Sequence, residues 1–227
     1  MTERTKNKTK GPTVVGTLKE ENDPYIPYYK GKGVGQDKPA KSMPKLSAFL
    51  RKNGATRILD FSCGTGRNLI FMAREGFDVY GFDFSEYAVR ICRQELKRER
   101  LRTEVRLCNA EAGLPYRSGS FDAVMLVRAM YQARMETIRQ WAEEVDRVTR
   151  EGGYVYLESY QNLLCFRRKD MRVEKIEPGT YGFFDDWHNQ VYHFFTKKEL
   201  RHLFEGYRTI RFYFKSRRYY ILLQKPY

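Results

Sequence analysis

The 227-residue sequence has little of what metal-binding, disulfide-rich and membrane proteins need. It holds four cysteines without a C-x-x-C pair and only three histidines. This scarcity predicts buried, reduced thiols and no metal site. No apolar run approaches the ~18 residues of a membrane helix, and the polar N-terminus lacks the apolar part of a signal peptide. We therefore expect a cytoplasmic protein, a monomer or homodimer, that does not bind a membrane.

Acidic residues are scarce at both ends of the chain. Residues 1–52 hold twelve basic and five acidic side chains, a net charge of +7, and residues 161–227 hold fourteen and seven, again +7. Residues 53–160 hold sixteen of each and are neutral. Basic flanks predict an acidic partner, for which nucleic acid is the obvious candidate. The alternative is that these cations cover solvated faces and a disordered tail.

Strands and helices alternate through the middle of the chain. The helix expected over 135–149 carries an apolar stripe of Met135, Ile138, Trp141, Val145 and Val148, and Gly152-Gly153 is expected to close it. Such alternation predicts an α/β fold, with a parallel sheet and helices on both faces. The strands are expected at 57–61, 78–82, 104–107, 121–127, 154–158, 209–214 and 219–223, and a further helix at 43–52.

The most informative segment is R57-I-L-D-F-S-C-G-T-G-R-N68 with G81-F-D83 after it. A strand, a glycine turn, a helix and a second strand ending in an acid predict a nucleoside site. Dinucleotide sites need a third glycine where this chain has Leu69, which leaves a dehydrogenase only a remote alternative. Asp60 would repel a pyrophosphate but favours a cationic ligand.

The segments I58-L-D-F-S-C-G-T-G66 and G81-F-D-F-S85 resemble the cofactor motifs of class I S-adenosylmethionine-dependent methyltransferases. The resemblance implies a Rossmann-like three-layer αβα sandwich, whose mostly parallel seven-stranded sheet has an antiparallel C-terminal strand. It also implies S-adenosyl-L-methionine as the cofactor. Ser62 stands where the family usually has its first glycine, so its backbone must avoid a strictly glycine-only conformation.

The same resemblance implies roles for individual residues. Asp60, Gly64 and Gly66 would line the methionine part of the cofactor. Asp83 would bind both ribose hydroxyls, and Phe84 would cover one face of the adenine. Asn109 stands where an Asp is common and can still accept a hydrogen bond. The expected cofactor set is Asp60, Ser62, Gly64, Gly66, Asn68, Asp83, Phe84, Asn109, Ala110, Val127 and Tyr29.

Composition and periodicity along the sequence also divide the chain. Residues 1–22 are expected to form a flexible basic tail, and 23–227 a single methyltransferase domain. Within it we expect a cofactor-binding core at 53–160, a substrate or lid insertion at 161–195, and a C-terminal helix and strand pair at 196–227. Thr196 and Glu199 predict a capping box at the start of that helix. The aromatic cluster Tyr25, Tyr28 and Tyr29 would either gate the cofactor or pin the tail by packing.

Three residues are candidates for the acceptor side. Arg128 could clamp an anionic acceptor or form a salt bridge with a carboxylate such as Asp60. Tyr131 could floor the pocket or simply pack in the core. His193 is the candidate general base, and the alternative is a structural hydrogen bond. It lies in a stretch, 177–200, that resembles bacterial and archaeal methyltransferases of unassigned substrate, including the tellurite-resistance type.

Methyl transfer from a sulfonium is an in-line displacement that mostly requires alignment, worth roughly 7 to 11 kcal/mol of the barrier. No strong catalytic motif is therefore expected. The leading hypothesis is methyl transfer to a small-molecule acceptor, because the aromatic insertion could enclose one. The alternatives are an RNA methyltransferase that uses the basic flanks, and a cofactor-binding protein without catalysis.

Overall fold

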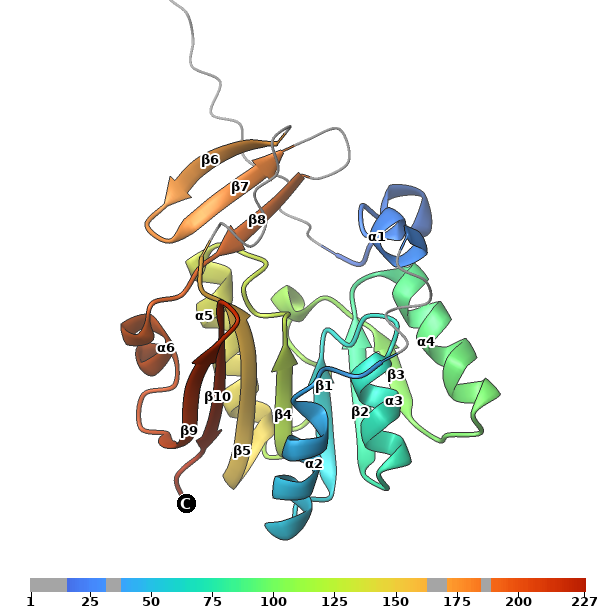
Figure 1. The fold of residues 1–227 in the computed structure, drawn as a ribbon. Coiled ribbons are helices and arrows are strands. Elements are labelled where there is room, and N and C mark those ends of the chain that lie inside the picture. The colour runs from blue at the N-terminus through green and yellow to red at the C-terminus, as the bar shows by residue number, and fades with distance from the viewer. Residues whose placement is uncertain (1–15, 32–37, 163–170, 185–188) are drawn as a thin grey trace, which may run out of the picture.

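The computed structural model describes residues 16–31, 38–162, 171–184 and 189–227, and Figure 1 shows a central sheet between layers of helices. The sheet order is β3-β2-β1-β4-β5-β10-β9. Strand β10 runs antiparallel to both its neighbours, and the other pairs are parallel. The predicted fold is confirmed. The strands are β1 (Arg57–Phe61), β2 (Asp78–Asp83), β3 (Glu104–Leu107), β4 (Phe121–Val127), β5 (Thr149–Tyr160), β9 (Arg208–Lys215) and β10 (Arg218–Gln224).

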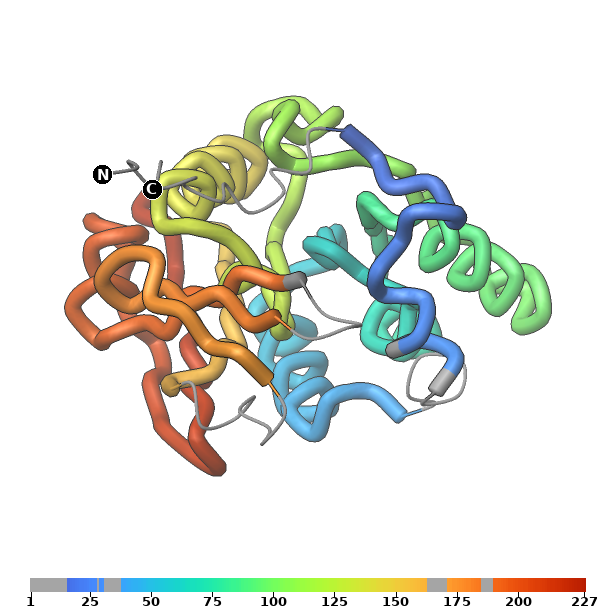
Figure 2. The backbone as a smooth tube through the Cα atoms, turned by 90° about the horizontal axis from the view of Figure 1, so that it is seen from above, coloured from blue at the N-terminus to red at the C-terminus, as the bar shows by residue number. Residues whose placement is uncertain are grey.

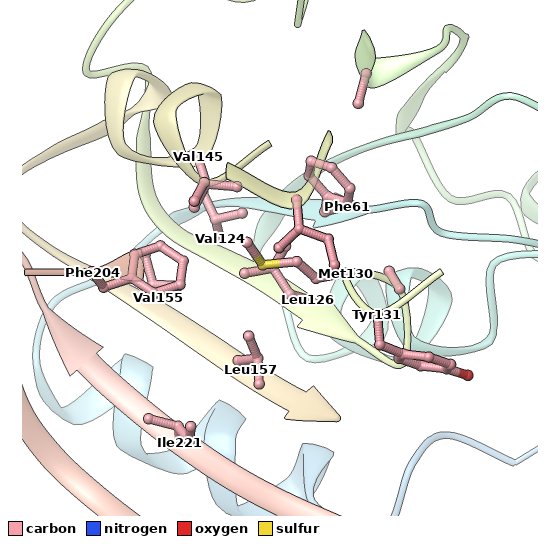
Figure 3. Packing of buried hydrophobic residues seen from close by; sticks show 14 of the residues in the cluster. Phe61, Val124, Leu126, Met130, Tyr131, Val145, Val155, Leu157, Phe204 and Ile221 are labelled. Atoms are coloured by element: carbon pink, nitrogen blue, oxygen red, sulfur yellow. The ribbon is translucent and has the colours of Figure 1, made fainter. Parts of the chain in front are cut away.

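Helices cover the sheet with two separate hydrophobic cores. On one face α2 (Met43–Lys52), α3 (Arg67–Arg74) and α4 (Glu86–Arg98) pack against β1 and β2. On the other, α5 (Met135–Val148) and α6 (Lys197–Leu203) pack against β4, β5 and β10. Figure 3 shows Val145 of α5 beside Val124 of β4 and Val155 of β5. Burial of both faces explains why β4 has the unbroken apolar run A-V-M-L-V.

The boundary between α5 and β5 differs from the prediction. The helix ends at Val148, and β5 starts at Thr149 and runs on through Gly152 and Gly153 to Tyr160. A side chain at Gly153 would lie 2.8 Å from the backbone oxygen of Arg150. The glycine pair is therefore part of an irregular strand and does not end the helix.

The predicted insertion at 161–195 contains regular structure in its described part. Strands β6 (Arg172–Glu177), β7 (Thr180–Phe184) and β8 (Asn189–His193) form an antiparallel three-stranded sheet. The backbone N–H of His193 donates to the oxygen of Tyr131 at 2.7 Å, which ties this sheet to the end of β4. Helix α6 follows with the predicted capping box of Thr196 and Glu199.

The described part of the predicted tail is ordered against the core. Leu18 forms a parallel bridge with Ser85, after which come a short 3-10 helix, η1 (Glu20–Asn22), and helix α1 (Ile26–Gly31). Figure 2, viewed onto the ends of the parallel strands, shows this segment in blue on one side and the three-stranded sheet in orange on the other. The two segments therefore flank the edge where the nucleoside motif ends.

Two expected absences can be compared with the structure. None of the helices in the described ranges is both long and apolar enough to span a membrane. In the same ranges, no three His, Cys, Asp or Glu side chains cluster as metal ligands would. Cys63 and Cys92 are buried and Cys108 is half-buried, all as free thiols. Cys165 and His188 lie outside the described residues.

Candidate cofactor and acceptor site

Asp60 lies in β1 and is buried, with 2% of its surface exposed. Its carboxylate accepts a hydrogen bond from the backbone of Leu69, while Oδ2 is buried without a hydrogen-bond partner. Burial, and then the charge of Asp83, raise the pKa of Asp60 to about 8. A buried carboxylate with an unpartnered oxygen costs free energy that a cationic ligand would recover.

The glycine turn after β1 bends through left-handed backbone. Ser62, Gly64 and Gly66 have φ angles of +54°, +56° and +93°. Serine can occupy the left-handed region at a cost of ~1–2 kcal/mol. The φ angle of Ser62 therefore lies in a region that is not restricted to glycine, as the sequence required. A side chain at Gly66 would lie 2.4 Å from Sγ of Cys92 on α4, so this glycine is required by helix packing.

Asp83 joins the glycine turn to the end of β2. Its Oδ2 accepts the backbone N–H of Gly64 at 2.8 Å, and its Oδ1 accepts that of Ser85 at 3.0 Å. The side chain is 3% exposed, and burial raises its pKa to about 6. Each carboxylate oxygen keeps a lone pair after accepting one N–H, so the geometry holds Asp83 ready for two further donors.

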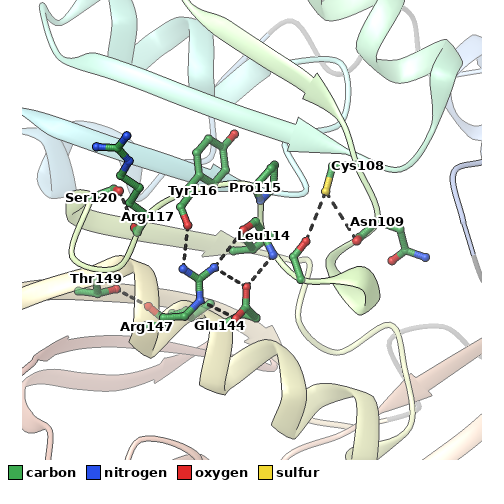
Figure 4. Close-up of polar contacts among 12 residues, drawn as sticks. Cys108, Asn109, Leu114, Pro115, Tyr116, Arg117, Ser120, Glu144, Arg147 and Thr149 are labelled. Carbon is green, nitrogen blue, oxygen red and sulfur yellow. Dashed lines mark hydrogen bonds and ion pairs between the residues drawn. The ribbon is translucent and has the colours of Figure 1, made fainter.

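The loop after β3 carries Asn109 and Ala110. Asn109 caps the 3-10 helix η2 (Ala110–Ala112) by accepting from the N–H of Glu111, and its Nδ2 donates to the oxygen of Gly16 at 3.1 Å. Figure 4 shows how α5 fixes this loop: Arg147 donates to the backbone oxygens of Leu114 and Tyr116, while Glu144 accepts from the N–H of Leu114. Asn109 is therefore held by its own turn and by the N-terminal segment.

Asn68, in the first turn of α3, holds a neighbouring segment of the chain. Its Oδ1 accepts the backbone N–H of Ala40 at 2.9 Å, and its side chain is buried. This bond holds the segment before α2 against the start of α3. Asn68 thus shapes the site from behind the glycine turn.

Aromatic side chains of the N-terminal segment lie beside the motif. The ring of Tyr25 meets Phe84 edge to face at 5.6 Å, and Tyr29 stacks on Tyr87 of α4 at 6.0 Å. A methyl group placed on Gly64 would lie 3.5 Å from the hydroxyl of Tyr29. Tyr29 therefore lies directly over the glycine turn, as the gate hypothesis requires, and its packing also pins the segment.

Sequence reasoning missed Asp23, which anchors this segment. Asp23 is buried, accepts from the hydroxyl of Ser85, and accepts from the N–H of Tyr25 at 2.8 Å. Glu20 adds an ion pair to Arg90 of α4 at 2.6 Å. A lone acid in a polar tail carries no pattern that would identify it, because its distant partner, Ser85, lies between β2 and α4.

The predicted acceptor side begins where β4 ends. Val127 is buried, and Arg128 after it has a φ of +60° and donates its backbone N–H to the oxygen of Glu158 at 2.8 Å. Tyr131 is 4% exposed and packs edge to face on Tyr160 at 5.3 Å. Buried packing is the alternative considered for Tyr131, and this geometry supports it.

A polar bridge closes the space between α1 and the three-stranded sheet. The Tyr25 hydroxyl lies 2.6 Å from Oε1 of Gln190 on β8 and 3.1 Å from Oε1 of Gln132, which follows β4.

Glu158, also missed by sequence reasoning, is buried at the end of β5, where it accepts from Ser42 at 3.0 Å and pairs with Arg218 at 3.5 Å. Three separate segments therefore converge on the end of the sheet.

His193 is the last residue of β8 and is fully buried. Its side chain is 0% exposed, its Nδ1 is 2.7 Å from the hydroxyl of Thr180, and Nε2 is 3.7 Å from Oε1 of Glu199. A side chain on Gly179 would lie 2.7 Å from Cε1 of His193. Burial lowers the pKa of His193. The hydrogen bond to Thr180 and the close packing on Gly179 support the structural alternative for His193.

Comparison with known proteins agrees with this geometry. A family model described as a methyltransferase domain matches residues 58–153. The 18S rRNA (guanine-N(7))-methyltransferase bud23 of Schizosaccharomyces pombe is 30% identical over 82 residues, which cover 36% of this chain and 30% of that protein. The match thus spans less than a third of that relative.

Solved structures extend the likeness over most of the chain. The PH0226 protein of Pyrococcus horikoshii OT3 has a TM-score of 0.70 at 19% identity, covering 87% of this chain and 98% of that one. The 1,6-didemethyltoxoflavin-N1-methyltransferase of Burkholderia thailandensis, solved with bound 1,6-didemethyltoxoflavin and S-adenosylhomocysteine, has a TM-score of 0.65 at 17% identity, covering 88% of this chain and 84% of that one. At these identities the likeness establishes the fold.

Proposed function

Because this chain belongs to the class I S-adenosylmethionine-dependent methyltransferase family and its cofactor is S-adenosylmethionine, we propose that it methylates a small-molecule acceptor. The observation that carries the assignment is the pair of buried carboxylates, Asp60 and Asp83, on either side of a left-handed glycine turn. When bound, the cofactor supplies an activated methyl group on a sulfonium. The reaction forms a bond from the acceptor to that carbon, breaks the carbon–sulfur bond and releases the acceptor's proton.

The residues present fit this cofactor by their donors and charges. We assign Asp60, with its unpartnered Oδ2, to the ammonium end of the methionine part. We assign Asp83 to the two ribose hydroxyls, because both its oxygens are oriented by backbone N–H groups. The glycine turn, Ser62 to Gly66, lets backbone approach the ligand between them. Phe84, Asn109 and Ala110 are assigned to the adenine end, Val127 to the closing wall and Asn68 to support.

The chain's own contribution to the reaction is alignment and exclusion of water. Tyr25 bridges Gln132 and Gln190, so α1, the end of β4 and β8 close together over the edge where the carboxylates lie. Tyr29 covers the glycine turn from the same helix. A closed site strengthens every charge interaction inside it. Closure of this kind supports a compact acceptor over a large one.

We place Arg128 and Tyr131 on the acceptor side. Arg128 follows β4 in left-handed backbone, at the sheet edge that carries both carboxylates. Its guanidinium suits an anionic acceptor, which a fork of donors would hold. Tyr131 is assigned to the packed floor beneath it, where Tyr160 and Tyr192 hold its ring. His193 is assigned to positioning, because its backbone N–H holds Tyr131.

An RNA acceptor is the second candidate. It is supported by the two basic flanks of +7 each and by the 18S rRNA methyltransferase among the relatives. The chain covers only 30% of that relative, so the relative's substrate enters here as a hypothesis. A cofactor-binding protein without turnover is the third candidate.

The test is transfer of label from methyl-labelled S-adenosylmethionine to a fractionated cell extract by the purified protein. We expect label in the low-molecular-weight fraction with the wild type and none with Asp83→Ala. Label confined to RNA would replace the small-molecule acceptor by the second candidate. Absence of label from every fraction, with cofactor binding intact, would favour the third candidate, a cofactor-binding protein without turnover.

A further inference from the structure

The outer strands of the main sheet carry a concentration of positive charge that the proposed function does not use. From residue 206 to the C-terminus the sequence holds no acidic residue but six basic ones. Five of the six lie on β9, β10 or the turn between them: Arg208, Arg211, Lys215, Arg217 and Arg218. Among the described residues, neither Arg211 nor Lys215 forms an ion pair. Cations at this density, with Arg211 and Lys215 outside any ion pair of the described ranges, favour a polyanionic partner.

The register places cations and tyrosines on one face of these strands. Side chains alternate between faces along a strand, so Arg211, Tyr213 and Lys215 share a face. Across the strand pair, Tyr213 is opposite Tyr220 and Lys215 is opposite Arg218. The two tyrosine rings stack with centroids 4.7 Å apart and planes within 2°. We call the surface formed by Arg211, Tyr213, Lys215, Arg218 and Tyr220 the basic tyrosine face.

The β9 part of this face is open to solvent, while Arg218 and Tyr220 on β10 are half-buried. In Figure 1, α2 lies in front of the sheet beside β5, and no helix of the described residues lies in front of β9. Arg211 and Lys215 are exposed, and 37% of the surface of Tyr213 is exposed. Strand β9 is also the last strand of the sheet. An open ring beside cations is the arrangement on which single-stranded nucleic acids stack their bases.

The turn between the strands adds a cation at a position where the backbone conformation is strained. Ser216 and Arg217 have φ angles of +51° and +60°, and the two residues join Lys215 to Arg218. A two-residue turn with both φ angles positive is normally made by Asn-Gly, since other residues are strained there. Arg217 therefore stands at the tip at a cost in conformational energy, beside Lys215 and Arg218.

The tip lies at the same edge of the sheet as the cofactor site, because Arg218 pairs with Tyr160 at the end of β5. We infer that the basic tyrosine face and its Arg217 tip bind single-stranded RNA. This goes beyond the proposed function, since the face would bind RNA whichever acceptor the site methylates. A second copy of the chain is disfavoured as the occupant, because identical basic strands repel each other. The opposing explanation is that the cations only shield an edge strand from aggregation.

The test measures binding of a fluorescein-labelled, unstructured RNA of about 12 nucleotides by anisotropy, between about 50 and 200 mM salt. The wild type is expected to bind with an affinity that falls with salt. Tyr213→Ala should weaken binding ~5- to 150-fold through loss of base stacking. The double variant Arg211→Glu/Lys215→Glu should abolish binding. Its matched control, Lys97→Glu/Arg102→Glu, makes the same charge change near the opposite edge of the sheet. This control variant should retain most of the RNA binding.

Arg217→Gly separates loss of binding from loss of folding. Glycine suits the left-handed turn, so this variant should unfold at an equal or higher temperature while its RNA affinity and salt slope fall. The inference would be overturned by absence of RNA binding at low salt, by equal losses in the control, or by tighter binding of DNA of the same sequence. Methyl transfer is measured separately: RNA bound but unlabelled leaves the small-molecule proposal standing, while labelled RNA replaces that acceptor.

Discussion

The side chain of Leu69 occupies the space that a side chain on Gly81 would need: a Cβ on Gly81 would lie 2.3 Å from Cδ1 of Leu69. Leu69 is the residue that replaces the third glycine of dinucleotide-binding turns, and it is fully buried between α3 and β2. A glycine on the strand therefore provides the close helix–strand packing that a glycine on the helix provides in those enzymes. The turn keeps its shape while losing the dinucleotide pattern.

This pairing predicts the effect of Gly81→Ala. The added methyl group should lower the free energy of unfolding by about 1–3 kcal/mol through overpacking. Leu69→Ala removes the side chain that would clash with the added methyl group, so the double variant should lose less stability than the sum of the losses of the single variants. Urea denaturation of all four proteins measures the coupling. Strictly additive losses would contradict the packing described for this pair.

The pKa values of Asp60 and Asp83, raised to about 8 and about 6, predict how stability depends on pH. Both exceed the ordinary value of about 4 for an unfolded chain, so folding favours the protonated acids. Their contribution to stability is complete below pH ~4 and is lost as pH rises through about 6 and about 8. The melting temperature of the cofactor-free protein should therefore fall over this range.

Asp60→Asn tests the origin of that fall, since it removes the group with the higher pKa. The difference in melting temperature between this variant and the wild type should grow in favour of the variant as pH rises from 6 to 9. The stabilisation by S-adenosylhomocysteine should grow with pH in the wild type, because its ammonium favours ionised Asp60. A pH-independent difference would show that Asp60 does not titrate there.

Tyr25→Phe should loosen closure of the site without unfolding the protein. The hydroxyl contacts Gln132 and Gln190, and loss of one net hydrogen bond of about 1 kcal/mol corresponds to a ~5-fold higher KM for cofactor and acceptor. Tyr207→Phe is the matched control, because its hydroxyl contacts Asp146 on α5 at 2.9 Å. Steady-state kinetics of both variants measure the difference, and equal KM changes would refute a role in closure.

His193→Gln distinguishes a positioning role from general base catalysis. An amide can keep a hydrogen bond to Thr180, so stability should fall by about 1–3 kcal/mol while the pH profile of kcat keeps its shape. Thermal unfolding and a pH–rate profile are both needed. Loss of an ionisation from the profile, at unchanged stability, would identify His193 as the base after all.

Much of the sheet was predictable because β4 is an apolar run and β1 and β2 lie at motif positions. The bounds predicted for β1, β3 and β4 and for the helix at 43–52 match the structure. The start of β5 could not be predicted, because Gly152 and Gly153 suggest a turn when only local sequence is considered. The three-stranded sheet was missed because β6 has no fully buried residue and lacks the strict alternation of a half-buried strand.

The cofactor side of the site was more predictable than the acceptor side for a physical reason. Asp60, Gly64 and Asp83 lie within one strand–turn–helix–strand unit, whose geometry is set by local sequence. Asp23, Gln190 and Glu158 each meet a partner that is far away in the chain, and they do so only through tertiary packing. Local periodicity carries no information about such contacts. The acceptor side therefore depends on the fold and not on a motif.

The central claim, that Asp83 and the glycine turn hold S-adenosylmethionine, is tested most directly by calorimetric titration with S-adenosylhomocysteine. Asp83→Ala removes the carboxylate that Gly64 and Ser85 orient, and two charge-assisted bonds of ~1.5–3 kcal/mol each predict at least a ~100-fold loss of affinity. Circular dichroism checks that the variant is folded. Saturable binding by the wild type that a folded Asp83→Ala variant has lost is the predicted result. Equal affinity in both proteins, or no binding by the wild type, would contradict the account.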